Sequence, residues 1–115
     1  MKLSNSYIGL PEDFYQVINP VPVKSPRFIA FNEELAQSLG LKMDPKVALQ
    51  YFSGNSIPEN TTPIALNYAG HQFGNFVHEL GDGRATLLGE IEVNKERFDI
   101  QLKGSGPTKF SRQGD

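Results

Sequence analysis

The sequence predicts an α+β domain in which short helices come first and antiparallel strands follow. Apolar residues recur at helical spacing in residues 32–52 and alternate at strand spacing in residues 85–103. Between these patterns lies the polar segment 53–63, "SGNSIPENTTP", which is typical of a loop. We therefore expect an N-terminal extension with two short helices in residues 1–75 and a strand-rich region in residues 76–115.

Two capping patterns define the expected helices. Asn32 is a typical N-cap residue, two glutamates follow it in the first turn, and Gly40 is a typical stop. The second helix is expected to begin after an Asp44 cap, with Pro45 at its first position, and to run to about Phe52. Both helices are short, so they contribute the smaller part of the predicted fold.

The strand signals lie in the second half of the sequence. Strict alternation in "ATLLGEIEV" puts Leu87 on the same face as Ile91. The run "RFDIQLK" alternates in the same way, and "NKE" between the two is a plausible hairpin turn. Before Gly81, "NFVHEL" is a candidate for a third strand. We predict an antiparallel three-stranded meander over about residues 76–103.

The composition limits the classes of function. A formal net charge of −2 over 115 residues argues against a dedicated nucleic-acid or membrane-surface binder. The absence of cysteine excludes disulfides, thiolate metal sites and cysteine nucleophiles. No apolar run approaches the roughly 20 residues of a membrane-spanning helix, and the first residues lack the apolar core of a signal peptide. We expect a soluble, cytoplasmic protein without a nucleic-acid or membrane partner.

A glycine-flanked turn precedes the first predicted long strand. Gly81 and Gly83 flank an aspartate at a position where a hairpin needs positive φ and little side-chain bulk. Such a turn also exposes backbone N–H groups to a phosphate, and Arg84 beside it can supply a planar donor fork. The tetrapeptide is therefore either an ordinary hairpin turn or one side of a phosphate site.

Lys103 ends the second alternating run on its polar face. A meander would place it beside the strand that follows Arg84, so the lysine can point under the glycine turn, as in kinase-like folds that hold nucleotide phosphates. An exposed strand lysine is the plain alternative. The run "KGSGPTK" is no Walker loop, because Lys103 precedes the glycines and Lys109 is followed by Phe110. With Arg112, the two lysines form either a solvated basic patch or a groove for an anion.

The histidine-containing segment "NYAGHQFG" gives no metal signal. His71 and His78 are seven positions apart, a spacing that suits no usual helical metal pair, so we expect no metal site in this chain. We expect a structural loop here that packs Tyr68 and Phe73.

Four segments taken together, "NYAGHQFGNF", "LGDGRATLLGEI", "FDIQLKGSG" and "FSRQGD", resemble the SelO family of protein adenylyltransferases. The N-terminal segment is similar as well, so the resemblance covers essentially the whole chain. It implies the N-terminal part of a protein-kinase-like fold and the transfer of AMP from ATP, bound in a flipped orientation, to Ser, Thr or Tyr hydroxyls of proteins. It further implies the cofactor-binding residues Gly81, Gly83, Arg84, Lys103 and Asp115.

The sequence departs from the family pattern in two places. Many members carry Thr-Pro-Tyr where this sequence has Thr108-Lys109-Phe110. The sequence also stops before the family's catalytic aspartate and metal ligands, so the resemblance implies a truncated piece with no catalytic or metal-binding residue of its own. Mg²⁺, with Mn²⁺ as an alternative, would be held by residues beyond Asp115, and the chain alone is expected to be inactive.

Two other functions stay open at this point. A kinase-like phosphotransferase would use the same nucleotide site with ATP in the other orientation. A non-catalytic nucleotide-sensing or protein-interaction module would use Arg84 and Lys103 only to hold an anion.

Overall fold

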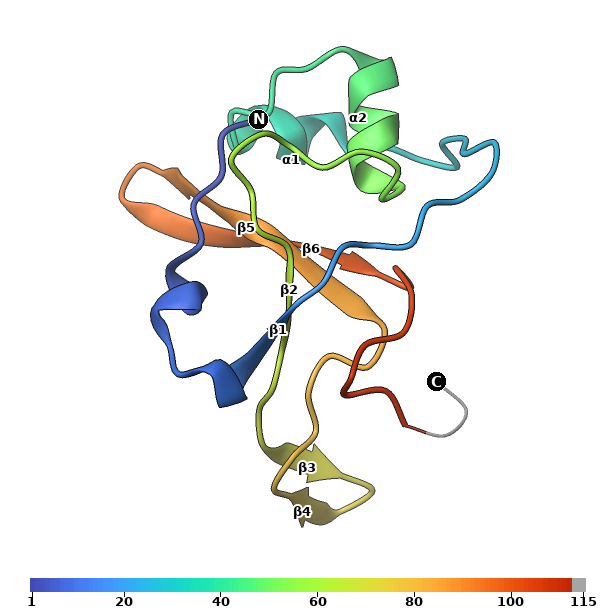
Figure 1. Cartoon of the computed structure of the whole chain (residues 1–115). Helices are drawn as coiled ribbons and strands as arrows, with labels where there is room; N and C mark the ends of the chain where they lie inside the picture. The colour runs from blue at the N-terminus through green and yellow to red at the C-terminus, as the bar shows by residue number, and fades with distance from the viewer. Residues whose placement is uncertain (113–115) are drawn as a thin grey trace.

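A four-stranded antiparallel sheet organises the chain in the computed structural model, which describes residues 1–112 (Figure 1). The strands in spatial order are β1 (Tyr15–Val17), β2 (Ile64–Leu66), β5 (Ala85–Val93) and β6 (Glu96–Lys103). Two short 3₁₀ turns, η1 (Ser6–Gly9) and η2 (Glu12–Phe14), precede β1. The other elements are α1 (Glu33–Ser38), α2 (Pro45–Phe52), β3 (Gly70–Gln72) and β4 (Asn75–Val77). The predicted α+β class is confirmed.

Both predicted helices and their caps are confirmed. The Asn32 side chain accepts a hydrogen bond from the Leu35 N–H at 2.9 Å, and the Asp44 side chain accepts one from the Lys46 N–H at 2.8 Å. Gly40 follows α1 with a φ of 70°, the left-handed conformation that ends many helices. The two helices lie together at one end of the molecule, away from the β3–β4 hairpin (Figure 1).

The antiparallel meander has a different first strand from the predicted one. Strands β2, β5 and β6 lie side by side, with Ile64 of β2 opposite Leu87 of β5. Strand β4, inside the run "NFVHEL", pairs with β3 instead, with Gly70 opposite Val77. The assignment of that run to the meander was therefore wrong. A strand of only three residues is too short for alternation to reveal it, which is why β2 escaped prediction.

A β-bulge in β5 changes which face its residues occupy. The pairing with β6 shifts between Leu87 and Gly89, which leaves Leu88 as the extra residue. Because one extra residue moves the alternation by one position, Leu87 shares a face with Glu90. The prediction that Leu87 and Ile91 share a face was wrong, because strict alternation assumes a regular strand.

The core lies on β5 and its neighbours. The buried apolar residues from the sheet and from the segment after it are Ile64, Ala65, Leu87, Leu88, Leu102 and Phe110. The helices add Ala36 and Ala48, and the residue directly after α1, Leu39, is also buried. Among residues 1–112, no helix has the length and apolar character needed to cross a membrane.

The segment "NYAGHQFG" is a hairpin and not the predicted loop. Its β3–β4 turn consists of Phe73 and Gly74, with φ values of 53° and 79°. The Phe73 side chain is 93% exposed, so the expectation that it packs was wrong. In its place, Phe76 forms edge contacts with His71 and His78, whose ring centroids lie 5.6 and 4.8 Å away.

Candidate functional site

Two glycine-rich segments meet at one end of the β5–β6 ribbon. Residues 81–84 lead into β5, and residues 104–111 follow β6. The carbonyl oxygen of Arg84 accepts hydrogen bonds from the N–H groups of Gly104, at 2.7 Å, and Ser105, at 3.2 Å. The next pair along the ladder is Ala85 opposite Lys103. The fold therefore brings Arg84 and Lys103 to the same end of the same strand pair.

Backbone carbonyl groups of the first segment are held by the second. The Thr108 hydroxyl donates to the Asp82 carbonyl at 2.6 Å, and the Thr108 N–H donates to the Gly83 carbonyl at 3.2 Å. The Ser111 hydroxyl also donates to the Gly83 carbonyl. In a trans peptide the C=O and N–H groups point in opposite directions. The N–H groups of Gly83 and Arg84 are thus turned away from Thr108.

Gly81 has a packing role of its own. Its φ is 71°, and a Cβ at this position would lie 2.9 Å from the Phe110 side chain and 3.1 Å from the Leu66 carbonyl oxygen. The segment is also not the tip of a hairpin between two paired strands, because β4 pairs with β3 and not with β5. The hairpin-turn interpretation of Gly81 and Gly83 was therefore wrong. Close approach to Phe110 explains why residue 81 is a glycine.

Asp82 is the residue of this segment that sequence reasoning missed. It is 6% exposed, and its carboxylate accepts hydrogen bonds from the Leu66 N–H, the Tyr68 hydroxyl and the Gln101 amide at 3.1, 3.2 and 3.3 Å. Burial, together with the charge of Asp82 and this hydrogen bond, raises the pKa of Tyr68. Asp82, which precedes β5, therefore links this segment to β2, to the residue Tyr68 that follows β2, and to β6. The only sequence signal was an acidic residue held between two glycines.

Lys103 lies at the edge of a groove of about 580 Å³. Its side chain is exposed, and Gly104 beside it also lines the groove. The other walls come from residues 23–32 and from α2, and they include Phe28, Phe31 and Phe52. The arrangement places two cationic residues, Lys103 and Arg27, beside a largely aromatic and aliphatic surface.

The two other cations of the predicted basic patch have different surroundings. The Lys109 N–H donates to the Gln16 side chain at 2.8 Å, and its ammonium lies 5.2 Å from the centroid of the Phe110 ring. Arg112 donates to the side chain of Gln72 in the β3–β4 hairpin. Lys109 therefore follows the glycine-rich turn and contacts β1, whereas Lys103 lies within the β5–β6 ladder.

Asp115 lies outside the described residues. Within residues 1–112, no group of three histidine, aspartate or glutamate side chains is placed to hold a metal ion.

Comparison with known proteins identifies the family. The whole chain, residues 1–115, matches the family described as protein adenylyltransferase SelO. A protein nucleotidyltransferase YdiU from Agrobacterium fabrum is 58% identical over 119 residues, covering 100% of this chain and 24% of the relative. The YdiU proteins of Rhodopseudomonas palustris and Bacillus cereus are 56% and 54% identical over 96% and 98% of this chain.

Those two matches cover 23% and 24% of the relatives, so the chain spans about a quarter of the length of the curated relatives it matches. The match to the Agrobacterium fabrum protein covers the whole of the present sequence, the helices as well as the glycine-rich segments. The chain belongs to the SelO family.

Proposed function

We propose that this chain is the N-terminal, nucleotide-binding part of a protein adenylyltransferase that transfers AMP from ATP to Ser, Thr or Tyr hydroxyls of proteins. One observation carries the proposal beyond family membership. The register that pairs Ala85 with Lys103, and the Gly104–Arg84 hydrogen bond beside it, gather a glycine-rich segment, an arginine and a lysine at one end of the sheet. That combination is suited to a chain of phosphates.

The chemistry of the groups at this end of the sheet supports a polyanionic ligand. The N–H groups of Gly83 and Arg84 are both turned away from Thr108, and Arg84 and Lys103 add a guanidinium and an ammonium group. All of these are hydrogen-bond donors, whereas phosphate oxygens are acceptors. The nearby carboxylate of Asp82 is engaged by Leu66, Tyr68 and Gln101, which reduces its repulsion of a phosphate.

In the proposed reaction, the acceptor hydroxyl oxygen attacks the α-phosphorus of ATP and gives its proton to a catalytic base. The bond from the α-phosphorus to the oxygen that bridges it to the β-phosphorus breaks, and pyrophosphate leaves with that oxygen. Bound Mg²⁺ would supply neutralisation of the charge that develops on the phosphate oxygens. We propose that the metal ligands and the catalytic base belong to the additional length of the family proteins. The part of Lys103 and Arg84 is to bind and orient the phosphates, so we expect no AMP transfer by residues 1–115 alone.

The test uses a family-length protein that carries this sequence, with Mg²⁺ and a protein acceptor. ATP is supplied with label either at the α-phosphate or at the γ-phosphate. The proposal expects label in the protein product from α-labelled ATP and none from γ-labelled ATP.

The other outcomes identify the competing functions. Label from the γ-phosphate alone would identify a kinase-like phosphotransferase, and ATP binding without any labelled product would identify a nucleotide-sensing module. Label transferred by the purified chain of 115 residues would contradict the proposed division of the site.

A further inference from the structure

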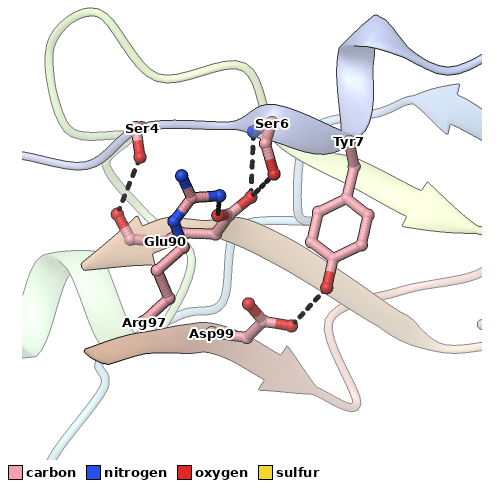
Figure 2. Close-up of polar contacts among 6 residues, drawn as sticks. All are labelled: Ser4, Ser6, Tyr7, Glu90, Arg97 and Asp99. Atoms are coloured by element: carbon pink, nitrogen blue, oxygen red, sulfur yellow. Dashed lines mark hydrogen bonds and ion pairs between the residues drawn. The ribbon is translucent and has the colours of Figure 1, made fainter. Parts of the chain in front are cut away.

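The N-terminal residues 3–7, here called the strap, lie beside β5, where Ser4 pairs with Glu90 next to the bulge (Figure 2). The Ser4 N–H donates to the Glu90 carbonyl at 2.9 Å, and the Glu90 N–H donates to the Ser4 carbonyl at 2.6 Å. Strand β2 pairs with the same edge of β5 at Leu87, and β6 occupies the other edge. The strap therefore continues the sheet beyond the end of β2.

A buried carboxylate ties the strap to β5. Glu90 is 4% exposed, and its Oε1 accepts hydrogen bonds from the Ser6 N–H at 2.9 Å and the Ser6 hydroxyl at 2.6 Å. Its Oε2 lies 3.5 Å from the Arg97 guanidinium on β6 (Figure 2). A buried charge is tolerated only with such partners. Loss of the strap would leave Glu90 with Arg97 as its partner among these contacts.

The strap also lies against the bulge itself. A Cβ on Gly89 would be 2.8 Å from both the Leu3 Cβ and the Ser4 carbonyl oxygen, so the strap fits only because residue 89 is a glycine. Asn5 ties the strap to the segment before β2, since its side-chain amide donates to the Thr62 carbonyl at 2.8 Å. The strap and the bulge are thus one packed unit.

The bulge decides which residue of β5 lies opposite Lys103. Beyond the bulge the ladder runs regularly to the pair Val93–Glu96 at the hairpin turn. If the bulge were absent and that turn kept its place, the pairing would slide by one residue and put Thr86 opposite Lys103. With the bulge, Ala85 takes that position and Arg84 accepts the Gly104 hydrogen bond.

We propose that the strap is a positioning device for the nucleotide site, which it serves by holding the β5 bulge and with it the register of Lys103. Ser6 and Glu90 are positioning residues that act through the sheet and do not touch the nucleotide. The inference that this register serves nucleotide binding rests on the proposed function. The structural coupling between the strap and the Gly104–Arg84 hydrogen bond is independent of that function.

The coupling between the strap and the Gly104–Arg84 hydrogen bond is tested by hydrogen exchange at the Gly104 amide in three strap variants of this chain. Ser6→Ala removes the hydroxyl that bonds the buried Glu90 carboxylate, and exchange at Gly104 should become about ten-fold faster. Ser6→Thr keeps a hydroxyl and should restore the original rate. Tyr7→Phe removes the 3.0 Å hydrogen bond from the same strap to Asp99 on β6 but keeps both Ser6–Glu90 hydrogen bonds, and should change the rate by less than about two-fold.

A helix variant separates positioning from general destabilisation. Ala48→Gly weakens α2, where Ala48 is buried, without touching the strap. Exchange at Gly104 should respond to Ser6→Ala and not to Ala48→Gly. Equal acceleration by both variants, or no acceleration by Ser6→Ala, would overturn the proposal.

The same variants in a family-length protein test what the register serves. Ser6→Ala should raise the KM for ATP by about three- to ten-fold with a smaller change in kcat, and Ser6→Thr should restore the KM. An unchanged KM beside faster Gly104 exchange would overturn the positioning role. A wild-type protein that binds no ATP would refute the proposed function, and the exchange experiment would still decide whether the strap holds the register.

Discussion

The two hairpins of this chain share a turn geometry and differ in almost everything else. The β5–β6 turn consists of Asn94 and Lys95 and the β3–β4 turn of Phe73 and Gly74, all four with positive φ. The β5–β6 ribbon is paired along eight positions and joined to β2 and the strap. The β3–β4 hairpin has three pairs and projects from the sheet (Figure 1). The two turns are alike, so the difference between the hairpins lies in the number of paired positions and in the neighbouring strands that hold them.

This difference in pairing explains which of the two hairpins can hold a binding residue in a fixed position. Leu87 and Leu88 are buried in β5, whereas the aromatic contacts of β3–β4 are among its own exposed residues and His78. Segments with few buried apolar contacts open at a small free-energy cost without unfolding the rest. A lysine that must hold a phosphate is therefore better placed at the end of β6 than on β3 or β4.

The largest expected effect comes from placing a methyl group in each hairpin. Gly89→Ala forces a Cβ against Leu3 and Ser4 and should lower the free energy of unfolding by about 1–3 kcal/mol. Gly74→Ala meets no atom within 4 Å and strains only a local turn, so the loss should stay below about 1 kcal/mol. Denaturant unfolding of both variants checks the contrast. Equal losses would show that β3–β4 is as firmly anchored as β5–β6.

A smaller and opposite effect is expected from relieving turn strain. Lys95 has a φ of 68°, which glycine adopts without a steric penalty, so Lys95→Gly should raise the free energy of unfolding by about 0.5–1 kcal/mol. Phe73→Gly relieves the same strain at a φ of 53° but in the hairpin that opens locally. Its effect on global stability should be within about 0.5 kcal/mol. Thermal unfolding of the two variants measures the difference, and a larger gain from Phe73→Gly would contradict it.

The smallest effect is a pH dependence at two tyrosines. A hydrogen bond to Asp99, then burial, raises the pKa of Tyr7, and burial, then the charge of Asp82, raises the pKa of Tyr68, both above the ordinary 10.0. The folded state therefore holds these protons more tightly than the unfolded state. Their contribution is complete below pH 10 and is lost as the pH rises through the folded-state values.

Unfolding measured between about pH 8 and pH 11 checks this contribution. Tyr7→Phe and Tyr68→Phe should each reduce the loss of stability at the alkaline end. An unchanged alkaline slope in both variants would mean that neither tyrosine is coupled to its carboxylate.

Local signals predicted well what depends on neighbouring residues. The caps at Asn32 and Asp44 and the β5–β6 hairpin were read from short stretches, because caps and alternation are encoded within a few positions. The bulge at Leu88 and the burial of Glu90 were not predictable in this way. The bulge breaks the strict alternation without a local signal, and the buried Glu90 carboxylate is bonded by Ser6, more than 80 positions away in the sequence.

The features of the candidate site show the same contrast between local signals and long-range contacts. The expected hairpin predicted that Arg84 and Lys103 lie at the same end of one strand pair, and the backbone pairing places the two residues there. The role of Asp82 and the contact of Gly81 with Phe110 did not follow, because each depends on a partner from a different strand or from the segment after β6. A sequence pattern records that a glycine is needed and does not record which side chain excludes a larger residue.

The central claim is that Lys103 binds nucleotide phosphate, and a pair of lysine variants in a family-length protein tests it most directly. Lys103→Ala removes a charge-assisted contact worth about 1.5–3 kcal/mol, which corresponds to roughly a 10- to 100-fold loss of ATP affinity. Lys109→Ala is the matched control, because it removes the same charge from the turn after β6, where the ammonium lies over Phe110. The account predicts a large loss of ATP binding by calorimetry for Lys103→Ala and a change below about two-fold for Lys109→Ala. Equal and small effects at both positions would contradict it and leave Lys103 an exposed strand residue.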